Sequence, residues 1–298
     1  MTPQFHPRRE LGRTGFRATQ LGIGDLADRN VPLADCVKTI HRALEAGLNL
    51  IDTAPSYENG YSEEIVGTAL KGRREGVFLI DKIDDLENPV APQVAASLQR
   101  LGTTPDLFVF HGVCTLEQWR KLRFDELSGR RGISCHNPEV LRVAIPSGHC
   151  DVVMFPVGAY VDDRYVTEIL PLARHHNVGT VCFKTFGAGK LLGDTEGYNQ
   201  PLSNRPRGKL SSGGSDAGGA TLPRLSVAEC LRYTLTLDPD VTLLGMSFPN
   251  EQDAVFAAAR EFKPLTPVQL ADTRRRAVAA MAGKGRCWWN PAPTPASH

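Results

Sequence analysis

The chain lacks both a membrane-spanning stretch and a surplus of one charge. Its 298 residues contain no run of about 18 consecutive apolar residues, and the N-terminal segment has no apolar core of the kind found in secretion signals. Lysine and arginine number 34 and aspartate and glutamate 33, so no overall field attracts nucleic acid or an anionic membrane. We therefore expect a soluble, cytoplasmic protein that has neither of these as a partner.

Motifs built on cysteine and on glycine are also missing. None of the seven cysteines forms a C-x-x-C pair, and an odd count argues against a disulfide framework, so we expect a reducing compartment. The C-terminal part has a single cysteine, Cys287, which is too few for an iron–sulfur cluster. Cys135 and His136, taken with His111, have poor ligand number and spacing for a metal, and we expect none. No G-x-G-x-x-G sequence follows an early predicted strand, which argues against a Rossmann domain.

What the chain does contain is a regular alternation of short apolar runs and helical patterns. Continuous apolar runs are typical of strands that are buried on both faces of a parallel sheet. The predicted strands are Leu21–Gly24, Leu48–Ile51, Val77–Lys82, Leu107–His111, Gly132–Ser134, Val152–Phe155, Thr180–Phe183 and Val241–Leu244. The predicted helices are 32–46, Ser62–Leu70 with Ser62 as N-cap, Pro89–Leu101, Leu116–Leu127, Pro138–Ala144, Val166–His176, Ser226–Leu237 and Glu251–Ala259. Eight such units predict an α/β fold, a single-domain (β/α)8 TIM barrel.

A few segments lie outside this alternation. Residues 9–19 suit a small N-terminal β-hairpin, and residues 266–298 are expected to form an extra C-terminal helix and a proline-rich tail. The barrel core is then about 19–262, and the whole chain, 1–298, is expected to be one domain. The segment Gly187–Pro223 is too polar and glycine-rich to pack, so it is either a lid or partly disordered.

Four ionisable residues fall at or just after the ends of three consecutive predicted strands. Asp52 and Tyr57 follow Leu48–Ile51, Lys82 ends the next strand, and His111 ends the one after it. In a barrel these strand ends are neighbours about 5 Å apart, so the side chains can converge. An aspartate keeps a lysine charged, and a lysine beside a tyrosine favours the phenolate. The set suits a reaction in which a carbonyl oxygen gains negative charge and then a proton.

The same residues lie in segments that resemble the aldo-keto reductase superfamily. These segments are RRELGRTGFRATQLGIG, IDTAPSYENGYSEEIVGTAL, FLIDKI, DLFVFHG, RGISCHNPEVL, FKTFGAGKLLG and LLGMSFPNEQ. The resemblance implies an oxidoreductase that reduces a small aldehyde or ketone with NADPH, NADH being the alternative. It implies Tyr57 as general acid, Lys82 as the group that eases the loss of its proton, Asp52 as the partner that holds Lys82, and His111 as the group that orients the carbonyl.

The resemblance also implies where a dinucleotide would bind. Ser134 would meet the nicotinamide amide, the ring would stack on Phe183, and the loop Gly187–Lys190 would cover the pyrophosphate. The adenosine end would lie near Gly245, Ser247 and Gln252. The implied cofactor-binding residues are Gly24, Asp25, Asp52, Ser134, Met154, Phe183, Lys184, Gly187, Gly189, Lys190, Gly245, Ser247 and Gln252. Trp288 and Trp289, in the tail, either cover the mouth of the pocket or form a packing patch.

Some positions depart from the family pattern and keep two other functions open. Cys135 and Met154 stand where the family usually has Asn and Gln, both contacts of the nicotinamide amide. No arginine for a 2′-phosphate is evident in the eighth strand motif, and Lys184 is one candidate to replace it. A Schiff-base aldolase or lyase would use Lys82 or Lys184. A non-catalytic barrel that binds the nucleotide and senses redox state is the other alternative. Substrate identity and oligomeric state do not follow from the sequence.

Overall fold

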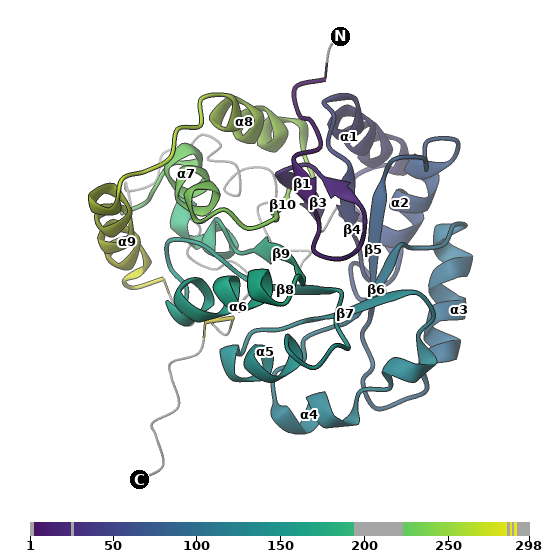
Figure 1. The fold of residues 1–298 in the computed structure, drawn as a ribbon. Helices are drawn as coiled ribbons and strands as arrows, with labels where there is room; N and C mark the ends of the chain where they lie inside the picture. Colours follow the sequence, from purple (N-terminus) through teal and green to yellow (C-terminus); the bar gives the residue numbers. More distant parts are fainter. Residues whose placement is uncertain (1–2, 25–26, 194–222, 285–286, 288, 291–298) are drawn as a thin grey trace.

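Eight parallel strands close into a barrel in the order β10-β3-β4-β5-β6-β7-β8-β9, which confirms the predicted architecture (Figure 1). The computed structural model describes residues 3–24, 27–193, 223–284, 287 and 289–290. The barrel strands are β3 Leu21–Gly24, β4 Leu50–Asp52, β5 Phe78–Ile83, β6 Leu107–Phe110, β7 Arg130–Ser134, β8 Val152–Pro156, β9 Gly179–Phe183 and β10 Val241–Gly245. The predicted strand boundaries therefore hold to within two residues.

Helices surround the barrel (Figure 1). They are α1 Leu33–Glu45, α2 Tyr61–Leu70, α3 Val90–Leu101, α4 Leu116–Lys121, α5 Pro138–Ala144, α6 Leu170–His175, α7 Val227–Leu237, α8 Pro249–Arg260 and α9 Pro267–Met281. Ser226 and Thr266 cap α7 and α9 through their side chains. The expected cap at Ser62 is wrong. The N-cap of α2 is Gly60, at φ 83°, and the buried Ser62 hydroxyl instead bonds Thr53 Oγ1 at 2.7 Å.

Two helices that the sequence predicted as continuous are interrupted. The helix expected over 116–127 ends early, because Leu122 adopts an extended conformation, and a 3-10 turn, η1 Phe124–Glu126, follows it. The helix expected over 166–176 begins as a π-helical turn, η2 Tyr165–Ile169, and continues as α6. Pro171 lies in the first turn of α6 and has no N–H for an i→i−4 bond, which accounts for the altered hydrogen bonding there.

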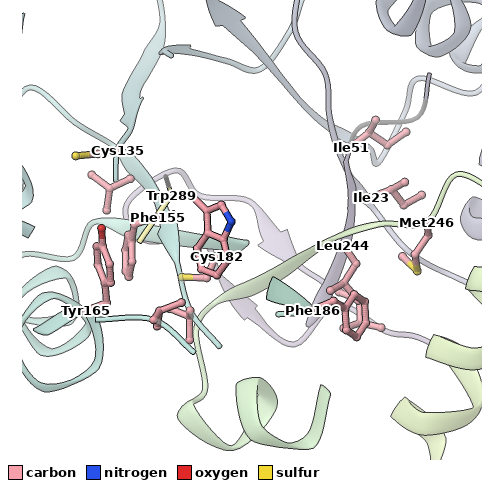
Figure 2. Packing of buried hydrophobic residues seen from close by; sticks show 14 of the residues in the cluster. Ile23, Ile51, Cys135, Phe155, Tyr165, Cys182, Phe186, Leu244, Met246 and Trp289 are labelled. Atoms are coloured by element: carbon pink, nitrogen blue, oxygen red, sulfur yellow. The ribbon is translucent and has the colours of Figure 1, made fainter. Parts of the chain in front are cut away.

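The apolar residues form one layer inside the barrel and another between the barrel and its helices. The inner layer contains Leu50, Phe78, Ile80, Leu107, Val109, Val152, Met154, Val181, Val241 and Leu243. The outer layer is larger, and Figure 2 shows part of it, with Ile23, Ile51 and Leu244 from the strands. Each fully buried side chain of this kind contributes about 1.5–3 kcal/mol to folding. The barrel interior is therefore a packed core and no channel.

The N-terminal hairpin closes one end of the barrel. Its strands, β1 Arg9–Glu10 and β2 Arg17–Ala18, pair in antiparallel fashion, as predicted. Leu11 is fully buried in the inner layer, and the ring of Phe16 lies 5.0 Å from that of Phe78. The hairpin approaches the N-terminal end of β9 so closely that a Cβ at Gly12, which has φ 51°, would lie 2.1 Å from the backbone nitrogen of Gly179. Among the described residues, the hairpin therefore covers the N-terminal end of the barrel strands.

After α9 the chain returns to pack on the barrel. Lys284 Nζ donates to the Lys190 carbonyl at 2.7 Å, and Lys190 Nζ donates to the Lys284 carbonyl at 2.6 Å. Trp289 is 1% exposed and lies in the outer layer, in the part that also holds Phe155 (Figure 2). Of the two interpretations of the tail tryptophans, Trp289 supports the packing one. Trp288, Asp25 and residues 194–222 of the segment Gly187–Pro223 lie outside the described residues. The first part of that segment, Gly187–Leu192, buries Leu191 and Leu192, so the expectation that it would not pack is wrong there.

Helix length and apolar character also bear on the membrane prediction. In the part of the chain that the structure describes, every helix is too short or too polar to cross a bilayer.

Candidate active site

The residues predicted to form the site occupy equivalent positions on all strands of the barrel. Side chains alternate along a strand, so a residue two positions beyond an inner-layer residue faces the same interior. Asp52, for example, follows Leu50 of the inner layer by two residues, and Lys82 follows Ile80. The same spacing along the strands gives Gly24, Asp52, Lys82, His111, Ser134, Met154, Phe183 and Gly245. These side chains and glycines therefore line the C-terminal mouth of the barrel.

Lys82 forms the most buried charged contact of this mouth. Its Nζ donates to Asp52 Oδ2 and to the Thr53 carbonyl, each at 2.7 Å, and both side chains of the ion pair are 2% exposed. The same Nζ lies 4.4 Å from the centre of the Tyr57 ring. A desolvated ion pair interacts more strongly than an exposed one because little water screens it. The ammonium is thus held by two acceptors and directed at the tyrosine.

Tyr57 lies in a tightly turned loop between β4 and α2. Glu58, Asn59 and Gly60 follow it with φ values of 50°, 52° and 83°. Arg29 fixes this turn by donating to the Glu58 carbonyl at 2.9 and 2.6 Å and to the Asn59 carbonyl at 3.1 Å. Residues in the left-handed region are unusual outside glycine and persist only where the surroundings hold them. The loop therefore gives Tyr57 a defined backbone position.

His111 packs against Tyr57 and bonds a residue that the sequence analysis missed. The two rings meet edge to face, with their centres 5.8 Å apart. Nδ1 of His111 bonds Oδ1 of Asp84. Asp84 follows Lys82 by two residues, just beyond β5, so the spacing that places the other site residues would also have predicted it. Sequence reasoning stopped at the lysine because that strand was expected to end there.

Asp84 also bonds the residue next to Tyr57. The Ser56 backbone N–H donates to Oδ2 at 2.8 Å, and the Ser56 hydroxyl donates to Oδ1 at 3.1 Å. Burial alone would raise the pKa of Asp84, but the hydrogen bond and charge of His111 and the bonds from Ser56 lower it below the usual value. Asp84 is therefore ionised at neutral pH and links the loops that carry Tyr57 and His111.

On the opposite side of the mouth lie the residues implied to hold nicotinamide. Ser134 is 2% exposed, and its hydroxyl accepts from the Gly112 N–H at 3.3 Å, while Met154 is buried in the inner layer. The half-buried Phe183 ring lies 5.2 Å from the His136 ring and 5.6 Å from Lys184 Nζ. Lys184 itself has φ 71°.

Cys135 and His136, which follow Ser134, differ in their surroundings. Cys135 is fully buried in the outer layer, and its thiol bonds the Asn137 carbonyl at 3.2 Å, so it packs behind the strand. The neighbouring His136 is the residue that meets Phe183, a contact that the sequence analysis did not predict. Burial and the nearby Lys184 charge lower the pKa of His136 to about 3, so its ring is neutral at physiological pH.

The loop expected at the pyrophosphate is a strained turn. It lies within a 3-10 segment, η3 Gly187–Leu192, in which Gly187, Ala188 and Gly189 have φ values of 56°, 57° and 89°. Lys190 is 1% exposed, and its ammonium is directed at the returning C-terminal segment through the Lys284 carbonyl. The backbone of this loop therefore turns at the mouth, whereas the buried Lys190 side chain contacts the C-terminal segment.

The residues expected near adenosine surround the start of α8. Gly245 is exposed and pairs in register with Gly24, and an added Cβ at Gly245 would meet only the Gly24 carbonyl, at 3.7 Å. The Ser247 N–H donates to Glu251 Oε2 at 2.8 Å. Gln252 is buried, and its Nε2 donates to the Thr39 carbonyl at 2.8 Å, whereas its Oε1 has no hydrogen-bond partner among the described residues.

Metal-ligating groups do not gather in the described ranges. Within them, no three His, Cys, Asp or Glu side chains are arranged so that they could hold a metal ion.

A sequence model of the Aldo/keto reductase family matches residues 18–275. Among curated proteins, the NADH-specific methylglyoxal reductase of Escherichia coli is 27% identical over an alignment of length 223, which covers 61% of this chain and 68% of that protein. The match covers about two thirds of the length of this relative and of two Bacillus subtilis relatives, an uncharacterized oxidoreductase and an aldo-keto reductase.

Solved structures show the same fold. The holo form of aldo-keto reductase AKR11C1 from Bacillus halodurans aligns over 93% of this chain and 97% of that one, with 24% identity and a TM-score of 0.65. An aldo-keto reductase from Klebsiella pneumoniae in complex with NADPH aligns over 90% and 95%, with 20% identity and a TM-score of 0.61.

Proposed function

The chain belongs to the aldo/keto reductase family, and we propose that this oxidoreductase reduces the carbonyl group of a small aldehyde or ketone with NADPH. The observation that carries the proposal is the position of Lys82 Nζ. It donates to Asp52 at 2.7 Å and lies 4.4 Å from the centre of the Tyr57 ring, with His111 on the edge of the same ring. A phenol between an ammonium and an imidazole is well placed to give up its proton to an oxygen that is gaining negative charge.

In this proposal the proton moves from Tyr57 to the substrate. A bound NADPH supplies the hydride that the carbonyl carbon needs. As the carbonyl oxygen becomes an alkoxide, the Tyr57 O–H bond breaks and a new O–H bond forms on the substrate. The remaining phenolate is stabilised by the Lys82 ammonium, and Asp52 keeps that ammonium in place. His111 fixes the carbonyl oxygen beside the phenol, and solvent returns the proton to Tyr57 after the alcohol leaves.

Several described residues support a dinucleotide in the mouth. Gly245 leaves exposed backbone at the end of β10, where an added Cβ would meet the Gly24 carbonyl at 3.7 Å, and this gives an extended ligand room to lie close to the barrel. Gln252 Oε1 is a buried acceptor with no partner among the described residues, and an exocyclic amino group of adenine is a donor that it could meet. The left-handed turn at Gly187–Gly189 resembles the backbone turns that bind phosphates. These features are better explained by a binding site for the cofactor than by a purely structural role.

We choose NADPH over NADH on the basis of one solved structure and one side chain. An NADPH complex is known for the Klebsiella structure, whereas the Escherichia coli relative is named as NADH-specific. Lys184, next to Phe183, remains our candidate for contact with a 2′-phosphate. Comparing the dissociation constants of the two dinucleotides, for the wild type and for Lys184→Met, decides between them.

The two alternative functions have less support from the same geometry. A Schiff base needs a neutral, accessible amine, and Lys82 is 1% exposed with its Nζ donating to two acceptors. The sensor alternative depended on altered amide contacts at Cys135 and Met154. Cys135 packs in the outer layer. A cysteine in place of the usual Asn therefore removes a contact with the nicotinamide amide but places no sulfur atom in the mouth. We therefore retain reduction as the proposed activity.

Tyr57→Phe tests the proposal. NADPH oxidation is followed with methylglyoxal, the substrate in the name of the Escherichia coli relative, and with a panel of other aldehydes and ketones. We expect kcat to fall by about 10²- to 10⁴-fold, while the dissociation constant of NADPH, from fluorescence quenching, changes less than about twofold. Tyr61→Phe is the matched control, because Tyr61 bonds the Val31 carbonyl at 3.2 Å and is outside the mouth. Full activity of Tyr57→Phe would refute the role of the phenol.

A further inference from the structure

We propose that Asp84 is a positioning residue that holds a proton on Nδ1 of His111, so that Nε2 is the nitrogen presented to the substrate. The hydrogen-bond assignment stands on the geometry alone, and its catalytic consequence rests on the proposed function. An ionised carboxylate can only accept hydrogen bonds, so the nitrogen that it bonds must carry the proton. The bond between His111 Nδ1 and Asp84 Oδ1 therefore selects one of the two neutral forms of the ring.

The carboxylate is itself held so that it cannot easily turn away. Ser56 donates to it twice, from the backbone N–H at 2.8 Å and from the hydroxyl at 3.1 Å, and Asp84 and His111 are equally shielded, with 25% of each side chain exposed. A histidine whose second nitrogen is fixed by a carboxylate keeps its orientation and its proton position, as in other functional sites. Ser56 adjoins Tyr57, so Asp84 sets the positions of both members of the Tyr57–His111 pair.

The groups around His111 leave its other nitrogen for the substrate. Tyr57, from the loop after β4, meets the ring edge to face, and Lys82, on β5, directs its ammonium at the Tyr57 ring. His136, from the segment after β7, is neutral at physiological pH. Asp84 is the group that bonds the ring, and none of the described residues forms a hydrogen bond with Nε2.

The proton position on the His111 ring decides which substrate groups Nε2 can bond. With the proton of the neutral ring on Nδ1, Nε2 is an acceptor and can bond the hydroxyl of an alcohol. To donate to a carbonyl oxygen, Nε2 must carry a second proton, and the Asp84 carboxylate can accept from Nδ1–H in either state of the ring. Asp84 thus keeps the ring in one orientation, with Nε2 facing the substrate oxygen in both directions of the reaction.

The proton position can be measured without any substrate. Long-range ¹H–¹⁵N correlation spectra of the full-length protein report which imidazole nitrogen is protonated, and His111→Gln identifies the His111 signals among those of the eight histidines. For the neutral ring of the wild type we expect a protonated Nδ1 and a bare Nε2. In Asp84→Ala we expect the proton on Nε2 instead, and in Asp85→Ala, an exposed neighbour that does not bond His111, we expect the wild-type pattern. A protonated Nε2 in the neutral wild-type ring would overturn the proposal.

Kinetics provide the second measurement. In Asp84→Ala we expect kcat/KM for carbonyl reduction at pH 6 to fall by roughly tenfold to a hundredfold, with the NADPH dissociation constant unchanged, and Asp84→Glu to recover part of the loss. Asp85→Ala, at the exposed neighbour, should keep the wild-type kcat/KM. A wild-type kcat/KM in Asp84→Ala at every pH would contradict the positioning role.

The proposed activity and the Asp84 assignment can be refuted separately. A protein that reduces no carbonyl compound but shows the expected nitrogen pattern refutes the function and leaves the Asp84 assignment intact. If Asp84→Ala does not fold, the wild-type spectrum still decides the proton position, and Asp84→Asn, which keeps the shape of the side chain, replaces it in the kinetic comparison.

Discussion

Lys82 and Asp52 form an ion pair of 2.7 Å in which both side chains are 2% exposed. Burial limits the screening of the pair by solvent, and removing one partner leaves the other charge buried. Such losses typically cost about 3–5 kcal/mol, far more than those of exposed pairs. The pair is therefore expected to matter for the free energy of unfolding as well as for activity.

Replacing Lys82 with Met tests this expectation. Met keeps most of the apolar stem, so the change removes mainly the charge. We expect the free energy of unfolding, from urea titration, to fall by about 3–5 kcal/mol and turnover to be lost. The double variant Lys82→Met/Asp52→Asn should regain stability without regaining activity. Lys38→Ala, which breaks an exposed pair with Asp35, is the control and should change stability by less than about 1 kcal/mol.

The second prediction concerns the other face of β5. Asp81 is fully buried behind Lys82, near Glu63 of α2, which pairs with Arg100 of α3. Burial and the negative charge of Glu63 raise the pKa of Asp81 to about 7. In the unfolded chain the same carboxyl loses its proton near pH 4, so between about pH 4 and 7 the folded state binds the proton and the unfolded state does not. The contribution of Asp81 to stability therefore falls as pH rises through this window.

Asp81→Asn should remove this pH dependence, because the amide does not titrate. We expect the variant to be more stable than the wild type at pH 8 and the difference between them to shrink toward pH 5, by at most about 1.4 kcal/mol per pH unit. Urea unfolding at several pH values measures it, with the exposed Asp125→Asn as control. Parallel curves for the wild type and Asp81→Asn would show that Asp81 titrates normally.

The third prediction concerns the C-terminal segment. Trp289 is 1% exposed in the outer layer, its ring centre is 6.4 Å from that of Tyr160, and its carbonyl bonds His136 Nδ1 at 3.3 Å. We expect Trp289→Ala to lower the free energy of unfolding by about 3–5 kcal/mol, because a large cavity replaces the indole. Val268→Ala, at a side chain that is 78% exposed, should change it by less than about 0.5 kcal/mol. If Trp289→Ala melts at the wild-type temperature, the segment is not part of the core.

Much of the candidate site could be predicted from the sequence, because Asp52, Lys82 and His111 fall at the ends of consecutive predicted strands, which are neighbours in a barrel. The structure adds that alternation along the strands, with a period of two, places all three on the inner face. The same rule would have added Asp84, two residues after Lys82. The helix beginning at Ser62 was misjudged, because a left-handed Gly60 caps α2 and only the folded chain brings Ser62 against Thr53.

The sequence by itself determined the repeating strand and helix units, the approximate limits of each strand, and the ionisable residues at three consecutive strand ends, because each depends on residues close together in the chain. Only the tertiary structure decided that Nδ1 of His111 meets Asp84, that Cys135 packs behind its strand while His136 meets Phe183, and that Trp289 returns to the core. These contacts join segments far apart in the sequence, and barrel closure and side-chain rotation, which no local pattern encodes, bring them together.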